Sequence, residues 1–179
     1  MKSVSIGNIF CAALLFFFPG CLRSQVLDPA IIAKPPVDSW PSYHGDYSGR
    51  RHSQLTQITP HNVGSLALAW SFQTSQAATI KSSPLLVDGV LYFTVPDNVW
   101  AVDARTGHQI WRYTYKPNEG MHLGHRGVAM YKRWLYFSTP DAHLISLEAK
   151  NGKVRWDVEV GDIKKGIGQP WRRWWYAIT

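Results

Sequence analysis

Short apolar runs separated by polar turns make up the chain from about residue 80 onwards. Runs of this kind, bounded by Gly, Pro, Asp and Asn, are typical of β-strands. Two-residue turns such as Asp88-Gly89 join neighbouring runs, which indicates tight hairpins. No long helical period follows residue 40. The pattern therefore predicts an all-β fold.

The strand pattern occurs twice, with a period of about 45 residues. Residues 101–111 read AVDARTGHQIW and residues 146–156 read SLEAKNGKVRW, so a small residue, an acid, a Gly turn and a Trp recur at matching positions. The preceding halves, LYFTVPDNVW from Leu91 and LYFSTPDAHL from Leu135, agree as well. Repeats of this length are typical of repeat architectures. The alternative is two ordinary hairpins with similar sequences.

Each copy predicts a hairpin with a tight turn and a docked Trp. The Gly supplies the positive φ of the turn, and the acid before it accepts backbone N–H bonds. Trp is large and flat, so it can bury itself against a neighbouring repeat. We therefore predict hairpins over residues 85–115 and 129–160, with Trp111 and Trp156 largely buried between the repeats.

The pattern A-x-D-x-x-T-G-x-x-x-W, matched in full by residues 101–111, resembles the tryptophan-docking motif of quinoprotein dehydrogenases. These are eight-bladed β-propellers that carry pyrroloquinoline quinone (PQQ), and eight such repeats need more than about 300 residues. Residues 40–72 are similar to the segment that leads into the propeller, and residues 124–131, GHRGVAMY, are similar to a cofactor-contacting loop. The resemblance implies an incomplete β-propeller of about two blades plus an N-terminal closing strand over residues 66–72.

The N-terminus is typical of a targeting segment. Lys2 precedes an apolar core over residues 9–18, which a Pro-Gly pair ends. We interpret residues 1–24 as a signal peptide or a lipoprotein leader, which implies export to the periplasm or to the periplasmic face of a membrane. A lipid anchor on Cys21 is one alternative, although the preceding Phe-Pro-Gly is atypical. A retained membrane anchor is another, and the short apolar run disfavours it.

Proline density and the loss of the strand pattern set the other boundaries. Residues 25–39 contain three prolines and predict an irregular linker. Residues 40–166 are expected to form the propeller blades. Residues 167–179 hold three of the nine Trp and fit no third blade. We interpret them as out-of-frame sequence, because the loss of one base after the Gly166 codon can generate this string from one that resembles the start of a blade. The alternative is an aromatic tail for a membrane or a partner.

The charge argues against one class of partner. The formal net charge is +7, but Lys and Arg are scattered along the chain. A nucleic-acid surface requires a coherent basic face, so we expect no nucleic-acid partner. Of the two cysteines, Cys11 lies within the leader. Once the leader is removed, no intrachain disulfide is possible.

The resemblance implies two cofactor contacts. PQQ is a tricarboxylate, so its pocket requires cations and bidentate donors. Arg126 occupies the position of the family Arg in an Arg-Gly loop, where it would hold a quinone carboxylate or the ortho-quinone oxygens. The alternative is an ordinary surface Arg, and His122 and His125 beside it are more typical of a solvated loop. Lys81 stands where the family often has Glu, and it could pair with a carboxylate as a point charge.

Besides Lys81, two departures from the family pattern bear on activity. Gly120 and Met121 stand where the family often has vicinal cysteines. The family's Ca²⁺ ligands and its Asp base lie in later blades, and no residue here matches them. Ca²⁺ requires six to eight oxygen ligands, and the sequence offers no Asp/Glu cluster to supply them. We therefore predict no catalytic and no metal-binding residues in this chain, and no activity for the chain alone.

Two functions remain open at this point. The first is part of a periplasmic PQQ-dependent dehydrogenase that oxidises an alcohol or a sugar, with Ca²⁺ as second cofactor and an electron acceptor as partner. The second is a non-catalytic propeller that uses the same repeat as a binding or assembly scaffold. Arg126 and the lead-in segment favour the first, whereas Lys81 and the absent cysteines leave room for the second.

Overall fold

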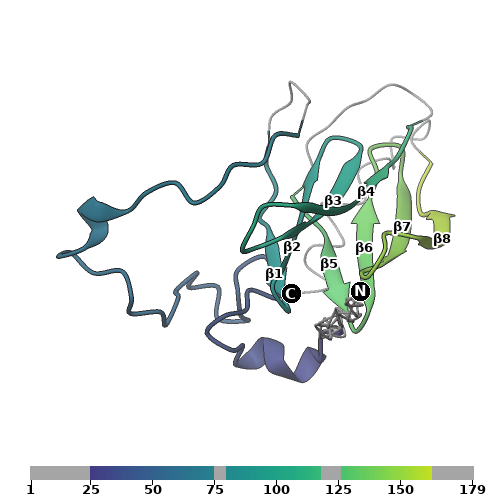
Figure 1. Ribbon diagram of the computed structural model, residues 1–179. Helices are drawn as coiled ribbons and strands as arrows, with labels where there is room; N and C mark the ends of the chain where they lie inside the picture. Colours follow the sequence, from purple (N-terminus) through teal and green to yellow (C-terminus); the bar gives the residue numbers. More distant parts are fainter. Residues whose placement is uncertain (1–24, 75–79, 118–125, 163–179) are drawn as a thin grey trace, which may run out of the picture.

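The computed structural model describes residues 25–74, 80–117 and 126–162. It contains two four-stranded antiparallel sheets, each with its strands in sequence order (Figure 1). The first sheet consists of β1 (Leu85–Val87), β2 (Val90–Val95), β3 (Asn98–Asp103) and β4 (Gln109–Thr114). The second consists of β5 (Ala129–Tyr131), β6 (Trp134–Ser138), β7 (His143–Glu148) and β8 (Val154–Glu159). The all-β class and both hairpin regions are confirmed.

The two sheets share the same irregularity in strand pairing as well as a similar sequence. The pairing of β3 with β4 shifts after Ala101, and the pairing of β7 with β8 shifts after Ser146. The residue opposite each of these positions is the repeat's Trp: Ala101 faces Trp111, and Ser146 faces Trp156. A bulge bends a strand and changes the direction of its side chains. The two copies are therefore one structural unit used twice, which excludes two unrelated hairpins.

Trp111, on β4, docks onto the turn between β7 and β8. Its indole N–H donates a hydrogen bond to the Ala149 carbonyl at 2.9 Å, and the residue is only 8% exposed. Gly152 lies under the ring, where a Cβ would come 2.6 Å from the indole Cε3. The same glycine has a φ of +70°, which favours Gly. The turn is thus shaped to receive the ring, and the prediction that Trp111 lies buried between the repeats is confirmed.

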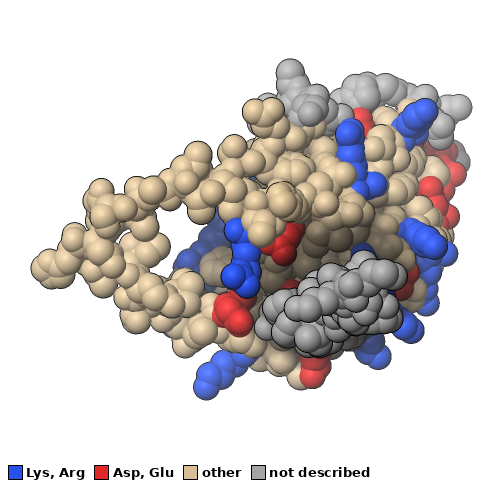
Figure 2. Space-filling model, viewed as in Figure 1, with Lys and Arg blue, Asp and Glu red and all other residues tan. Residues whose placement is uncertain are grey.

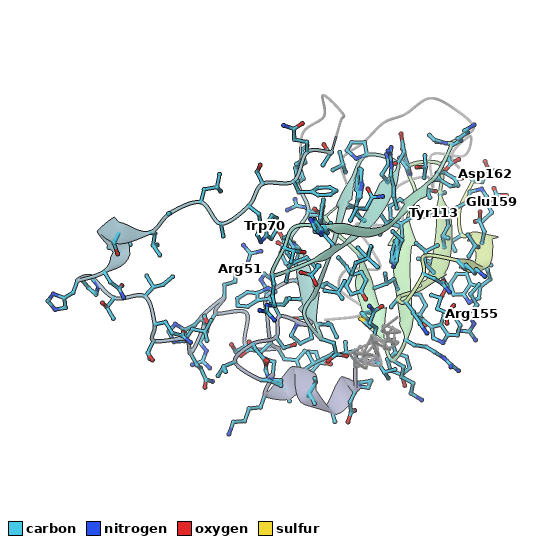
Figure 3. The ribbon with its side chains drawn as sticks, viewed as in Figure 1. Arg51, Trp70, Tyr113, Arg155, Glu159 and Asp162 are labelled. Carbon is cyan, nitrogen blue, oxygen red and sulfur yellow. The ribbon has the colours of Figure 1, made fainter. Side chains whose placement is uncertain are left out.

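Trp70 makes the same contact one repeat earlier. Its indole N–H donates to the Ala104 carbonyl at 3.2 Å, and a Cβ on Gly107 would come 2.6 Å from its ring. Figure 3 shows Trp70 beside the first sheet, where the lead-in segment meets it. Each repeat's turn therefore accepts the Trp that precedes it in the sequence.

Trp156 departs from the prediction. It is only half-buried, and β8 is exposed along most of its length. The reason is that burial of this Trp requires a turn from a further repeat. No such turn covers it among the residues that the structure describes. The prediction of a largely buried Trp156 is therefore wrong for this structure, although its motif is intact.

The lead-in segment also differs from the prediction. Residues 66–72 are not a strand. They belong to the lead-in segment (residues 40–72), which forms a long irregular arm that extends away from the sheets (Figure 1). The arm carries the 3₁₀ helix η2 (Val63–Ser65) and exposed apolar side chains, with Leu68 83% exposed. A strand needs a neighbouring strand to pair with, and none lies beside this segment in the described structure. The arm nevertheless docks at its end, where Phe72 packs against Phe93 and Trp100 at ring distances of 5.7 and 6.3 Å.

Residues 25–39 are more ordered than an irregular linker. The 3₁₀ helix η1 (Pro29–Ala33) begins with a cap, in which Asp28 accepts a hydrogen bond from the Ala30 N–H at 2.9 Å. Pro at the first helical position is favourable because its missing N–H has no partner there. Leu27 is fully buried and bridges to Lys132 at the β5–β6 turn. The segment therefore packs on the second sheet. No helix in the described ranges is long and apolar enough to cross a membrane.

The main core lies between the two sheets. It includes Tyr92 of the first sheet and Phe137 of the second, both fully buried. The Tyr92 hydroxyl donates to the Ala149 carbonyl at 3.2 Å, the same oxygen that Trp111 uses. The other face of the first sheet is covered by Phe72. The first sheet is thus packed on both faces, whereas the outer strand of the second sheet is exposed.

The Asp103 carboxylate, in the turn after β3, is expected to make the stability of the fold depend on pH. The Asp103 carboxylate accepts hydrogen bonds from the Thr106 hydroxyl (2.8 Å) and from the N–H groups of Thr106 (2.8 Å) and Arg105 (3.0 Å). These bonds, that of the Thr106 hydroxyl most of all, lower the pKa of Asp103. A lowered folded-state pKa stabilises the fold above the unfolded-state pKa, and this contribution is lost as pH falls through the folded-state pKa.

We therefore expect the melting temperature of the wild-type chain to fall in the acid range more steeply than that of Asp103→Asn. Circular dichroism melts at stepped pH measure this difference. Asp38→Asn serves as the control, because Asp38 is exposed and lies outside the turn. Parallel acid profiles for wild type and Asp103→Asn would contradict the role given to this carboxylate.

Candidate functional site

The two residues that the sequence marks as cofactor contacts lie just before equivalent strands. Lys81 precedes β1 and Arg126 precedes β5. Their segments run side by side, because the Ser83 N–H donates to the Arg126 carbonyl at 3.1 Å. Gly127 makes this approach possible: a Cβ there would lie 2.9 Å from the Ser83 carbonyl oxygen, and its φ is +126°. The Arg-Gly pair therefore places Arg126 beside the start of the first sheet.

Arg51, from the lead-in segment, reaches the same place. Its guanidinium donates from Nη2 to the Ser83 hydroxyl at 2.9 Å and stacks over the Tyr43 ring, 4.7 Å from the centroid. A longer bond of 3.5 Å runs from Nη2 to the Tyr43 carbonyl. Figure 3 shows Arg51 between the arm and the first sheet. The Ser82 hydroxyl donates a hydrogen bond to the Thr94 carbonyl at 2.8 Å, which holds the neighbouring backbone against β2.

Tyr43 connects the two arginines. Its phenol is hydrogen-bonded by the Arg126 side chain, and this contact lowers the pKa of Tyr43. A hydrogen bond from Ser83 and the positive charges of Arg126 and Arg51 also lower this pKa, whereas partial burial raises it. We call Tyr43, Arg51, Ser83 and Arg126 the arginine cluster. It joins the lead-in segment, the first sheet and the second sheet at one point.

The arginine cluster is suited to anion binding. Two guanidinium groups converge on one phenol, and both arginines are exposed. Arg binds carboxylates through paired N–H donors. The arrangement can therefore hold and orient a carboxylate.

Charge elsewhere on the surface is mixed. Figure 2 shows Lys and Arg interspersed with Asp and Glu on the visible face of the sheets, while most of the arm is uncharged. A nucleic-acid surface would require a coherent basic face, and this view shows none. The arginine cluster is therefore a local feature of the structure and not part of a broad basic surface.

Lys81 is exposed, and the backbone bond of Ser83 brings its segment next to Arg126. That the two side chains approach one another remains a prediction. Residues 118–125, with the positions of the absent cysteines and of both loop histidines, lie outside the described residues. The leader predicted over residues 1–24, the alternative of a lipid anchor at Cys21 and the out-of-frame tail predicted over residues 167–179 lie outside the described residues as well.

The described residues do not fit a metal ion. No group of three His, Cys, Asp or Glu side chains within them is placed to hold one. PQQ, the cofactor that the resemblance implies, fits better than a metal ion. Its carboxylates match the guanidinium, phenol and hydroxyl donors of the arginine cluster. These residues thus fit a polycarboxylate ligand but not Ca²⁺.

Comparison with known proteins decides the family. The family described as the β-propeller domain of glucose, ethanol and alcohol dehydrogenases, named for PQQ, matches residues 40–157. The chain belongs to this PQQ β-propeller family. The match begins at Trp40, includes the arm, the arginine cluster and the first sheet, and ends within β8 of the second sheet. In this family, the two sheets are two propeller blades.

The PQQ-family chain is similar to quinone-dependent alcohol dehydrogenases. It is 36% identical over 136 residues to a quinohemoprotein alcohol dehydrogenase of Comamonas testosteroni, covering 71% of this chain and 19% of that protein. It is 40% identical over 162 residues to the dehydrogenase subunit of alcohol dehydrogenase (quinone) from Gluconobacter oxydans, covering 83% of this chain and 21% of that subunit. The chain thus spans about a fifth of the length of these relatives.

Solved structures agree with the fold. The crystal structure of the Comamonas testosteroni enzyme matches with a TM-score of 0.68 and 33% identity, covering 76% of this chain and 22% of that one. A europium-containing methanol dehydrogenase matches with a TM-score of 0.69 and 29% identity, covering 76% and 25%. The incomplete propeller of about two blades predicted from the sequence is therefore confirmed.

The sequence reasoning missed three members of the arginine cluster. Tyr43 and Arg51 lie in a polar, turn-rich stretch, and Arg51 reads there as half of a local basic pair with Arg50. Ser83 reads as part of a strand over residues 80–87, whereas β1 begins only at Leu85. Their contacts cross long sequence separations, 32 residues between Arg51 and Ser83. No local pattern carries such a contact, so only the fold could show it.

Proposed function

We propose that this chain is the quinone-binding N-terminal part of a periplasmic PQQ-dependent dehydrogenase that oxidises an alcohol or a sugar. One observation supports this most strongly. The Arg126 segment, which resembles the family's cofactor-contacting loop, is held beside the start of the first blade, and a second guanidinium and a phenol converge there. Carboxylates of the quinone fit such a set of donors.

The residues of this chain would bind and orient the cofactor. When bound, PQQ supplies the two-electron oxidation of the substrate and passes the electrons to an acceptor. The Arg126 guanidinium would hold a carboxylate or the quinone oxygens through paired N–H donors. Lys81 would add a point charge. Because the described residues do not fit Ca²⁺, we assign the metal and the catalytic base to parts of the enzyme beyond these two blades.

The first test is the binding of PQQ to the purified chain by equilibrium dialysis. We expect Arg126→Gln to weaken binding about tenfold to a hundredfold, since a charge-assisted hydrogen bond contributes about 1.5–3 kcal/mol. Arg105→Gln is the matched control, because Arg105 is an exposed Arg on the turn after β3. We expect it to bind like the wild type.

The outcomes separate the two candidate functions. Saturable PQQ binding that depends on Arg126 and not on Arg105 supports a dehydrogenase part. Equal weakening of PQQ binding by both substitutions would show that PQQ is attracted by the overall positive charge and not by a specific site. No binding by a folded wild-type chain would contradict the proposal and favour a scaffold that uses the same repeat.

A further inference from the structure

We propose that Tyr43 and Arg51 of the lead-in segment position the Arg126 guanidinium, so that the arm is part of the ligand site as well as of the fold. This inference rests on the proposed role of Arg126 in binding a carboxylate of the quinone. Tyr43 is the hydrogen-bond acceptor that orients Arg126, and Arg51 fixes Tyr43. Both act through Arg126 and are positioning residues.

The contacts form a closed circuit. Arg51 donates to the Ser83 hydroxyl at 2.9 Å, and Ser83 in turn hydrogen-bonds the Tyr43 phenol. Arg126 bonds the same phenol through its side chain, and its carbonyl accepts from the Ser83 N–H at 3.1 Å. Tyr43, Arg51 and Ser83 are therefore each held by at least two other members, and Tyr43 in turn holds the Arg126 side chain. Linked hydrogen bonds of this kind strengthen one another and restrict side-chain motion.

The circuit matters because Arg126 is exposed. An exposed Arg loses considerable side-chain entropy when it is held for a ligand. A guanidinium has five N–H donors, so a bond to Tyr43 can fix its plane and leave other donors for a carboxylate. Pre-orienting a binding group in this way reduces the entropic cost of binding.

The neighbouring arginine provides an internal comparison. Arg50 is exposed like Arg51, but its Nε donates to the Ser48 hydroxyl at 3.0 Å, within its own loop. Arg51 instead crosses to the first blade and covers the Tyr43 ring. Two adjacent residues of one type thus differ in whether they reach the cluster. Arg50→Gln is therefore the matched control for Arg51→Gln.

The first measurement is the ionisation of Tyr43, followed by the ultraviolet absorbance of tyrosinate. The chain has eight Tyr, so the Tyr43 signal is the difference between the wild type and Tyr43→Phe. The titratable and charged groups that face Tyr43 are His44 and Arg51 on its own segment and Arg126 from the segment just before β5. We expect Arg126→Gln to move the Tyr43 midpoint to higher pH, Arg51→Gln to move it less, and Arg50→Gln to leave it unchanged.

The second measurement is the dialysis of PQQ against the same variants. We expect Tyr43→Phe and Arg51→Gln to weaken PQQ binding about threefold to tenfold, the size of one lost hydrogen bond, and Arg50→Gln to have no effect. Circular dichroism confirms that each variant is folded. A Tyr43 midpoint that does not move in Arg126→Gln would overturn the positioning role, whatever the binding result.

Failure of the wild-type chain to bind PQQ would instead count against the proposed function. The Tyr43 titration would still decide whether the circuit exists. PQQ binding that is normal in a folded Tyr43→Phe chain would show that the circuit only fastens the arm, and would also overturn the proposal.

Discussion

Replacing Trp111 by Ala is expected to lower the free energy of unfolding of the two-blade unit by about 3–5 kcal/mol, the usual cost of truncating a buried Trp. The ring is 8% exposed, lies over Gly152 and packs against Tyr92 at 6.0 Å. Its N–H bond to the Ala149 carbonyl, at 2.9 Å, is lost as well. This residue joins the first blade to the turn of the second, so its loss removes a large part of the interface between them.

Urea unfolding followed by circular dichroism measures this effect, and the chain offers a matched control. Trp156 has the same motif position and strand pairing but is half-buried. We expect Trp156→Ala to cost on the order of 1 kcal/mol, as substitutions outside well-packed contacts do. Equal losses for the two variants would show that docking onto the next turn is not what stabilises the pair of blades.

The same two Trp show how far the sequence determines the fold. The repeat, the turn glycines and the hairpin boundaries are local features, because an acid, a Gly and a Trp at fixed spacing impose one turn geometry. The sequence therefore predicts both sheets. Burial depends on the neighbour as well: Trp111 has the turn around Gly152 to dock on, whereas no described turn covers Trp156. A motif can specify the contact a residue is able to make, but not whether its partner is present.

The lead-in arm shows the same limit. Residues 66–72 have the composition of a strand, yet strand formation requires a partner strand, and the described structure places none beside them. Exposed apolar residues on the arm, such as Leu68, are what a segment with such an unmet partner would show. The docked end, at Trp70 and Phe72, follows the repeat rule because its partner turn is present.

The site was predictable in part for a related reason. Arg126 belongs to a local Arg-Gly motif, and the structure explains that motif by the close approach of Gly127 to the Ser83 carbonyl. Tyr43 and Arg51 carry no motif, because their role depends on where the arm crosses the blades. Long-range contacts of this kind are set by the fold and not by neighbouring residues.

The largest functional effect we expect is that the 179-residue chain alone gives no PQQ-dependent oxidation of alcohols or sugars. The arginine cluster offers donors that hold an anion, but catalysis also requires a base placed to take a proton from the substrate hydroxyl. Groups that act as one catalytic unit lose most of their effect when part of the unit is missing. The chain spans about a fifth of the length of its relatives, so a binding role without turnover is the expected result.

The measurement is the reduction of an artificial electron acceptor by the purified chain with PQQ, Ca²⁺ and a series of alcohols and sugars. The Comamonas testosteroni quinohemoprotein alcohol dehydrogenase, to which the chain is similar, serves as the positive control. Substrate-dependent reduction by the chain alone would contradict the prediction and would place the base within these two blades. Tyr43 would then be the first candidate, because its phenol lies in the arginine cluster and the Arg126 hydrogen bond lowers its pKa. Loss of that turnover in Tyr43→Phe, with PQQ binding retained, would identify Tyr43 as the base and end its assignment as a positioning residue only.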